Sequence, residues 1–342
     1  MPAGEGTYAR LQPATCADPG GGQAELASTG RELIVVNKVA GLVQFYEVGS
    51  WARLGELEMP KLPHEVVLSP DGKTAYVSIY GLGIWSKNDE HPGREVVIID
   101  LATRRRIGSI DVSPHRGPHG MAFDARGVLW ISCDVSGVIV AVDVAARAVL
   151  AAVSTESFGT HWLVVTPDGD KLYASNKSFP FVVVIDTRER RLLGKIPAPN
   201  GSEGLALAPD GRRLYVAAQR PHALYVIDTA TDTVVETVAL AGFAATPPER
   251  NPQKRVRVSP DGRELLVTSF NTGEIVIAPV DDLRAQTKLA VEKGPMGITF
   301  ADPRLAYVTN HDQGTVCVVD VPNRAVIGKF STAPGPETMA LY

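Results

Sequence analysis

The stretch PHEVVLSPDGKTAYVSI (63–79) decides the fold, because its plan recurs along the chain. It holds a short apolar run, a PDG turn and a second apolar run rich in Val and Tyr. Proline presets the backbone for a tight turn, and glycine tolerates the positive φ that such turns require. The plan returns in six further segments: AELASTGRELIVV (24–36), PHGMAFDARGVLWIS (118–132), THWLVVTPDGDKLYAS (160–175), SEGLALAPDGRRLYVA (202–217), KRVRVSPDGRELLVTS (254–269) and PMGITFADPRLAYVT (295–309). Each copy predicts two strands joined by a turn.

Two more strands are expected after each pair. A third apolar run ends near an aspartate, as in EVVIID (95–100) and FVVVID (181–186), and a more polar fourth run follows it. The second run occurs seven times, and no helical periodicity separates the copies. The sequence therefore predicts an all-β fold, a seven-bladed β-propeller of four-stranded antiparallel blades. The alternative is an all-β sandwich, which the single recurring template disfavours.

The repeat also predicts the domain organisation. Stacked repeats share one continuous core, so we expect a single propeller domain over 23–342 after a loose polar lead-in over 1–22. Two segments compete to complete the first blade and seal its open edge. One is PGPETMALY (334–342), which matches the start of PHEVVLS in register, and the other is AELAS (24–28). The sequence leaves this choice open.

The composition excludes several classes of protein. The 342 residues are 44% hydrophobic, and the net charge of −4 gives no preference for nucleic acid or anionic membranes. No apolar run approaches the roughly 18 residues of a membrane span. The N-terminal stretch lacks the basic and apolar parts of a secretory signal, so a cytoplasmic location is expected, or a periplasmic or secreted one if a signal peptide was removed. Cys16, Cys133 and Cys317 indicate no disulfide framework. The oligomeric state is not predicted.

Several repeats carry a family resemblance. The units SPDGKTAYVS, APDGRRLYVA and LAYVTN (305–310) resemble the YVTN-type seven-bladed β-propeller family, from about residue 24 to the end of the chain. The resemblance implies the fold, but that family includes both binding proteins and enzymes, so it does not choose a function. The short segments GPHGM (117–121) and GPMGI (294–298) are similar to streptogramin-lyase-like propellers. Those use His and Glu with a divalent metal at the channel mouth, which implies a reaction class only.

One position of the repeat carries an unusual set of residues. It lies eight residues before the turn glycine and opens the innermost strand, so its side chain is expected at one mouth of the central channel. Successive copies place there His64, His119, His161, Glu203, Lys254, Met296 and Glu337. Strand topology puts the remaining histidines on the same face as rim residues, where loops concentrate binding and chemistry: His91, His115, His222 and His311.

Three histidines from consecutive blades predict a metal site. Neutral imidazoles suit Zn²⁺, Fe²⁺, Mn²⁺ or Cu²⁺, which this ligand set does not distinguish. The predicted ligands are His64, His119, His161 and Glu203. Glu203 could instead act as a general base, Glu65 could orient a histidine or act in catalysis, and Tyr80 is a third candidate catalytic residue. The alternative is a set of histidines that bond one another and ordered water.

A second ring of polar residues is expected where the second strands end, on the same face. Its Lys and Arg residues favour a small, anionic substrate over a cation, and no nucleic-acid or membrane partner is expected. The predicted substrate-binding residues are Lys38, Trp162, Asn176, Lys177, Arg220, Lys254, Arg255, Asn271 and His311. No organic cofactor is predicted, because P-loop, GxGxxG, CxxC, HExxH and GxSxG motifs are absent.

These observations favour a metal-dependent enzyme of the lyase, isomerase or hydrolase type that acts on a small anionic metabolite. With Fe²⁺ or Cu²⁺ the same three-histidine site would serve an oxidoreductase. The alternative from another class is a non-catalytic propeller that binds a peptide, glycan or protein through its loops. A lactonase-type propeller is a weaker match, because those usually bind the metal through carboxylates and Asn.

Overall fold

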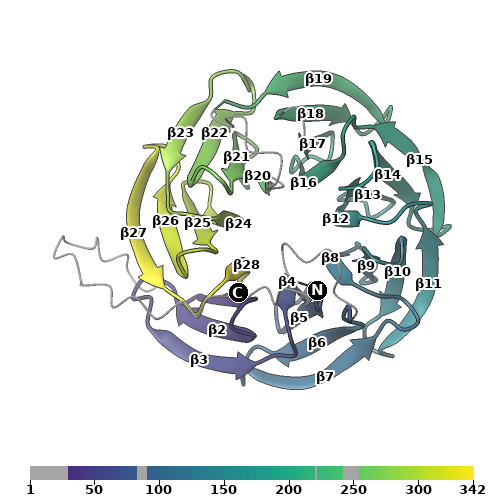
Figure 1. The fold of residues 1–342 in the computed structure, drawn as a ribbon, viewed down its shortest axis with the longest axis horizontal. Coiled ribbons are helices and arrows are strands. Elements are labelled where there is room, and N and C mark those ends of the chain that lie inside the picture. Colours follow the sequence, from purple (N-terminus) through teal and green to yellow (C-terminus); the bar gives the residue numbers. More distant parts are fainter. Residues whose placement is uncertain (1–29, 83–90, 220–221, 242–253) are drawn as a thin grey trace, which may run out of the picture.

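The computed structural model describes residues 30–82, 91–219, 222–241 and 254–342. They form seven four-stranded antiparallel sheets arranged as blades around one axis (Figure 1). The predicted all-β seven-bladed propeller is confirmed, and the sandwich alternative is wrong. No described segment forms a helix of the length and apolarity that a membrane span needs.

The innermost strand of each blade runs beside the axis, and the second strand pairs with it. The innermost strands, from blade 1 to blade 7, are β28 (Pro336–Leu341), β4 (Pro63–Leu68), β8 (Pro118–Phe123), β12 (Thr160–Val165), β16 (Ser202–Leu207), β20 (Val256–Val258) and β24 (Pro295–Asp302). The second strands are β1 (Glu32–Asn37), β5 (Thr74–Ile79), β9 (Leu129–Cys133), β13 (Lys171–Asn176), β17 (Arg213–Ala218), β21 (Glu264–Ser269) and β25 (Leu305–Asn310).

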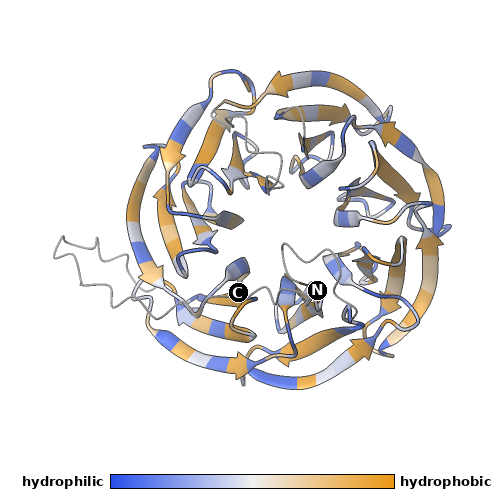
Figure 2. Ribbon diagram, viewed as in Figure 1, coloured by the Kyte–Doolittle hydropathy of each residue, from blue (hydrophilic) through white to orange (hydrophobic). Residues whose placement is uncertain are grey.

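The two outer strands complete each blade. The third strands are β2 (Leu42–Glu47), β6 (Glu95–Asp100), β10 (Val138–Asp143), β14 (Phe181–Asp186), β18 (Ala223–Asp228), β22 (Glu274–Pro279) and β26 (Thr315–Asp320). The fourth strands are β3 (Arg53–Glu58), β7 (Arg105–Asp111), β11 (Ala148–Ser154), β15 (Arg191–Pro197), β19 (Thr233–Ala239), β23 (Thr287–Ala290) and β27 (Ala325–Ser331). The third strands are buried, whereas the fourth alternate between hydrophobic and hydrophilic residues (Figure 2). This alternation is typical of a strand with one face in water.

The last strand of the chain closes the ring. β28 pairs antiparallel with β1, so the chain end completes the first blade as its innermost strand. The backbones of Glu32 and Tyr342 exchange hydrogen bonds of 2.9 Å in both directions. Arg104 and the Tyr342 hydroxyl both donate to the Glu32 carboxylate. The segment 334–342 thus has the closing role, while AELAS (24–28) lies outside the described residues.

The hydrophobic core lies between neighbouring blades. One cluster joins Tyr173 and Val184 of blade 4 to Leu205 and Tyr225 of blade 5. Another joins blades 1 and 2 through residues such as Phe45 and Val97. Because each sheet buries both faces of its middle strands, each blade depends on its neighbours for its core. This packing gives the innermost strands a rigid base.

Candidate functional site

Seven side chains, one from each blade, meet where the innermost strands begin. We call them the axial ring and the end of the axis where they lie the mouth. Each is at most 4% exposed, although six of the seven residues are ionisable. The members are His64, His119, His161, Glu203, Lys254, Met296 and Glu337. The register expected from the sequence therefore holds in space, except that Lys254 precedes β20, which begins at Val256.

Hydroxyl groups of the second strands hold the axial ring in place. The Ser132 hydroxyl accepts a hydrogen bond from the Gly120 N–H in its own blade and donates to the His161 carbonyl of the next blade. Ser78 makes the same connection to the His119 carbonyl, at 3.0 Å. A buried hydroxyl that satisfies two backbone groups ties adjacent innermost strands together. The backbone beneath the ring histidines is therefore well anchored.

The residue that follows each axial-ring member in the sequence forms a second layer around the axis. In three blades this residue is a glycine, because the next innermost strand comes too close for a side chain. A Cβ at Gly120 would lie 2.6 Å from the His161 carbonyl oxygen, and one at Gly204 would lie 2.5 Å from that of Lys254. The other blades supply Glu65, Trp162, Arg255 and Thr338. Glycines thus alternate with larger residues around this layer.

One cluster at the mouth has the donors of a metal site. His64, His119 and Glu65 each offer a ligand atom within 4.8 Å of the others, and all three are buried. The two imidazole Nε2 atoms face each other at 2.5 Å. The Glu65 carboxylate lies 3.7 Å from His64 Nε2 and accepts a hydrogen bond from Arg255 NH2 at 2.9 Å. Two imidazoles and a carboxylate are a ligand set that Zn²⁺ and Fe²⁺ commonly use.

The opposite edge of the His64 ring is held by a carboxylate. His64 Nδ1 forms an ion-pair contact with Glu337, and Lys38 Nζ lies 3.5 Å from the same carboxylate. A carboxylate at Nδ1 favours the tautomer with its proton there, which leaves the Nε2 lone pair free for a cation. Burial lowers the pKa of His64 well below its usual range, and Glu337 opposes this. His64 is therefore neutral near pH 7.

The adjoining ring residues form a separate pair. His161 Nε2 lies 3.1 Å from the Glu203 carboxylate, which also contacts Lys177 Nζ at 3.3 Å. Burial would raise the pKa of Glu203, but Lys177 and His161 outweigh it and hold the value at about 2. His161 also packs against His119, with ring centroids 3.6 Å apart, so the four predicted ligands adjoin one another, and the predicted set of three histidines and Glu203 stays a prediction.

The pKa values of Glu65 and His119 are also shifted by burial. Burial raises the pKa of Glu65 to about 7, although Arg255 acts in the other direction. Burial lowers the pKa of His119 well below its usual range, and neighbouring histidines lower it further. His119 Nδ1 has no hydrogen-bond partner among the described residues. A bound cation would stabilise the ionised carboxylate and the neutral imidazole that ligation requires.

The predicted catalytic Tyr80 stands beside both histidines. Its ring lies 5.3 Å from that of His64 and 5.1 Å from that of His119, centroid to centroid. Its hydroxyl donates to Asp134 at 3.0 Å, and Asp134 in turn lies 3.5 Å from His161 Nδ1. Tyr80 therefore connects the two groups of the mouth.

The predicted substrate-binding residues fall into two groups. Lys38, Lys177, Arg255 and Trp162 lie at the axis. Two others form hydrogen bonds with backbone carbonyls. Lys254 Nζ donates to the carbonyls of Ala218 and Gln219, and the Asn176 side-chain amide donates to the carbonyl of Phe158.

The remaining predictions lie at the edge of the site or beyond the described residues. His311 is 3.8 Å from Glu337, and the Asn271 amide makes no hydrogen bond within the described part of the chain. Arg220 is outside the described residues. Of the predicted rim histidines, His91 is exposed and His115 half-buried.

Sequence reasoning assigned no role to three residues that the structure brings to the axis. Glu337 holds the ring position of blade 1, which the repeat register already indicates. Asp134 follows the second strand of blade 3, where the second polar ring is expected. Arg257 gives no signal from its type or spacing, yet its guanidinium lies 5.3 Å from the Trp162 ring.

Comparisons with known proteins support the fold alone. Neither a protein-family model nor a curated protein matches this chain. Among solved structures, a periplasmic gluconolactonase of Pseudomonas aeruginosa is similar, with a TM-score of 0.73, 19% identity and coverage of 91% of this chain and 98% of that one. The hydrazine synthase of Kuenenia stuttgartiensis matches with a TM-score of 0.68 and 18% identity, over 81% and 88% of the two chains. The YVTN-type and streptogramin-lyase-like resemblances stay predictions.

Proposed function

We propose that the protein is a metal-dependent enzyme of the hydrolase type whose divalent cation is held at the mouth by His64, His119 and Glu65. The observation that carries the proposal is the convergence of these three buried donors within 4.8 Å. Glu65 bonds Arg255 on one side and lies beside two buried imidazoles on the other, and burial raises its pKa to about 7 while it lowers the pKa of His119. A divalent cation would compensate that arrangement.

The surrounding residues suit such a site. Glu337 orients His64 from its far edge, as carboxylates do behind many metal-bound histidines. When bound, the cation would act as a Lewis acid toward a substrate oxygen or activate a water molecule. Glu203 stays ionised beside Lys177 and His161, so it would position a water molecule or a substrate hydroxyl as a hydrogen-bond acceptor, while its pKa of about 2 makes it a weak general base. The fold neighbour from Pseudomonas aeruginosa is a gluconolactonase, and this likeness adds support for hydrolysis.

Charge supports a small anionic substrate or product. Three cations at the mouth face carboxylates: Lys38 faces Glu337, Lys177 faces Glu203 and Arg255 faces Glu65. Lys254 donates to backbone carbonyls instead, and a divalent cation would add to the positive charge of the mouth. A positive, largely buried mouth favours an anion.

Elemental analysis of the purified protein tests this proposal. We expect about one Zn, Fe, Mn or Cu per chain, or stoichiometric uptake when the chelated protein is titrated with each ion. Hydrolysis of a panel of lactones, esters and phosphoesters, followed by proton release, should depend on that metal. Uptake below about 0.1 ion per chain with every metal offered would remove the proposal.

The His119→Ala variant should lose both the metal and the metal-dependent activity. His91→Ala is the matched control, because His91 is an exposed histidine that is not a member of the axial ring. Hydrolysis that survives in His119→Ala at the wild-type rate would contradict the site. If the protein binds the metal but catalyses a lyase or isomerase reaction, the metal site would be supported and the proposed hydrolysis contradicted.

A further inference from the structure

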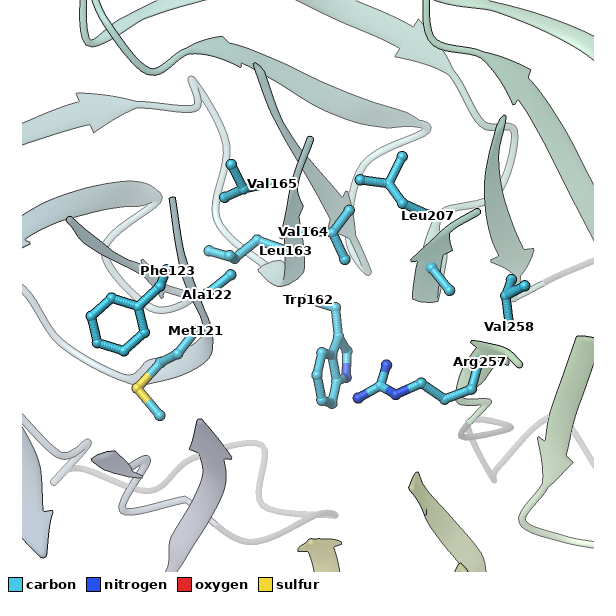
Figure 3. Close-up of a pocket in the computed structure, with 11 residues that line it drawn as sticks. Met121, Ala122, Phe123, Trp162, Leu163, Val164, Val165, Leu207, Arg257 and Val258 are labelled. Carbon is cyan, nitrogen blue, oxygen red and sulfur yellow. The ribbon is translucent and has the colours of Figure 1, made fainter. Parts of the chain in front are cut away.

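A cavity lies beyond the axial ring, along the innermost strands of blades 3 to 6. Its volume is about 350 Å³. It begins one residue past the ring, at Trp162, and continues toward the turns that join the first and second strands. Most of the lining residues have apolar side chains, among them Met121, Phe123, Val164, Leu207 and Val258 (Figure 3). A cavity of this size can enclose a small organic molecule.

Three buried side-chain donors at and beside this cavity have no acceptor within the described residues. Trp162 and Arg255 are 7% and 3% exposed, and Trp162 Nε1, Arg255 Nε and Arg255 NH1 have no partner within the described ranges. Arg257 NH1 reaches only the backbone carbonyl of Val256, at 3.3 Å. Buried donors without acceptors are rare in native proteins and require an explanation. The missing partner must supply acceptors, because no side chain here does.

Both guanidinium groups gather at one indole. Arg255 Cζ lies 3.9 Å from the centroid of the Trp162 ring, and Arg257 Cζ lies 5.3 Å from it. Figure 3 shows the Arg257 guanidinium beside the nitrogen-bearing edge of that indole. Both are cation–π contacts, and they bring two positive charges and the indole N–H to one place in the cavity wall.

The charges at the cavity do not balance. The Arg255 charge is offset by Glu65 at 2.9 Å. No described carboxylate lies within ion-pair distance of Arg257. Burial lowers the pKa of Arg257, and the charge of Arg255 lowers it further. Since an arginine keeps its proton in proteins, one positive charge remains without a counterion.

We propose that this cavity binds a monoanionic organic acid, with its carboxylate on Trp162 Nε1, Arg255 and Arg257 and its apolar body against the strands of blades 3 to 5. A single carboxylate balances the one excess charge, whereas a phosphate dianion would overcompensate it. The apolar side chains of the lining would contact a hydrocarbon body. The site goes beyond the proposed function, because Trp162, Arg255 and Arg257 are not metal ligands, although Arg255 also bonds the proposed ligand Glu65.

Calorimetric titration of the chelated protein with hexanoate tests the inference. Acetate shares its charge, and 1-hexanol shares its chain. We expect hexanoate to bind at least about 10-fold more tightly than either, because charge-assisted hydrogen bonds and apolar burial both contribute. Equal affinity for hexanoate and 1-hexanol would overturn the inference, since it would mean that no anion site is present.

Two substitutions locate the binding. Arg257→Gln should weaken hexanoate binding at least about 10-fold, because the unbalanced charge is removed. Arg263→Gln is the matched control, since the Arg263 side chain is 84% exposed on a turn. If Arg257→Gln fails to fold, Trp162→Phe removes one donor and should weaken binding about threefold. Wild-type affinity in either folded variant would overturn the inference.

The metal-site variant separates this inference from the proposed function. His119→Ala should lose the metal yet bind hexanoate as the wild type does. Arg257→Gln should keep its metal content while it loses hexanoate binding. Failure of the metal experiment therefore leaves the anion experiment interpretable, and the reverse holds as well.

Discussion

His64, His119 and His161 occupy the same position in three successive blades, but the side chains around them differ. His64 and His119 face each other and share Glu65, whereas His161 faces Glu203 and Lys177. The backbone holds His119 and His161 in the same way, through a hydroxyl of the preceding blade. The difference lies in the partners alone. Equivalent histidines of a repeat can therefore have different surroundings, a second imidazole and Glu65 in one place and the Glu203–Lys177 pair in the next.

The largest expected effect separates the two groups by metal affinity. His119→Ala should weaken metal binding by more than about 100-fold, since it removes a ligand. His161→Ala should change it less than about twofold, because His161 bonds Glu203 instead. Competition titration against a chromogenic chelator measures both. Equal losses in the two variants would support the three-histidine set predicted from the sequence.

The second effect concerns stability. Glu203→Gln should lower the free energy of unfolding by about 3 kcal/mol at pH 7, because Lys177 and His161 lose a buried partner. Urea denaturation measures it, and Glu189→Gln serves as the exposed control. A loss no larger than that of the control would show that Glu203 is not an ion-pair partner.

The same pair predicts a pH dependence. The folded-state pKa of Glu203 is held at about 2, below that of the unfolded chain. Its contribution is therefore complete above pH 4.5, its usual value, and is lost as the pH falls from there toward 2. The stability difference between wild type and Glu203→Gln should shrink by about 1 kcal/mol between pH 6 and pH 4. A difference that stays constant over this range would contradict the lowered pKa.

A smaller effect on metal affinity is expected at Glu337. Glu337→Gln should weaken metal binding about 10- to 100-fold, because the amide holds the Nδ1 proton of His64 less firmly. The same chelator competition measures it, and loss of the fold must be excluded by circular dichroism. An unchanged affinity would show that Glu337 serves only Lys38.

The smallest effect is expected at Tyr80. Tyr80→Phe removes one hydrogen bond to Asp134 and should cost about 1 kcal/mol of stability. Metal affinity should not change, because the ring still packs beside His64 and His119. A large loss of metal would instead make the hydroxyl part of the site.

The repeats alone are enough to predict the blades and the ring position. In five copies a turn glycine lies eight residues after the ring residue near the start of the innermost strand. This fixed spacing by itself places His64, His119, His161 and Glu203 at the axis. Composition does not say which of these residues contact one another. Side chains that share a position in the repeat still point to different neighbours, as the two groups of the mouth show.

Tertiary structure alone decided the ring closure, the contacts within the axial ring and the second layer. β28 and β1 are at opposite ends of the chain, and Arg255 meets Glu65 across 190 residues. Contacts over such separations leave no local pattern, because they depend on how seven blades share one axis. The sequence determined which residue types reach that axis, through short-range turn chemistry and strand alternation. Long-range packing then determined which charges pair and left one, at Arg257, without a described counterion.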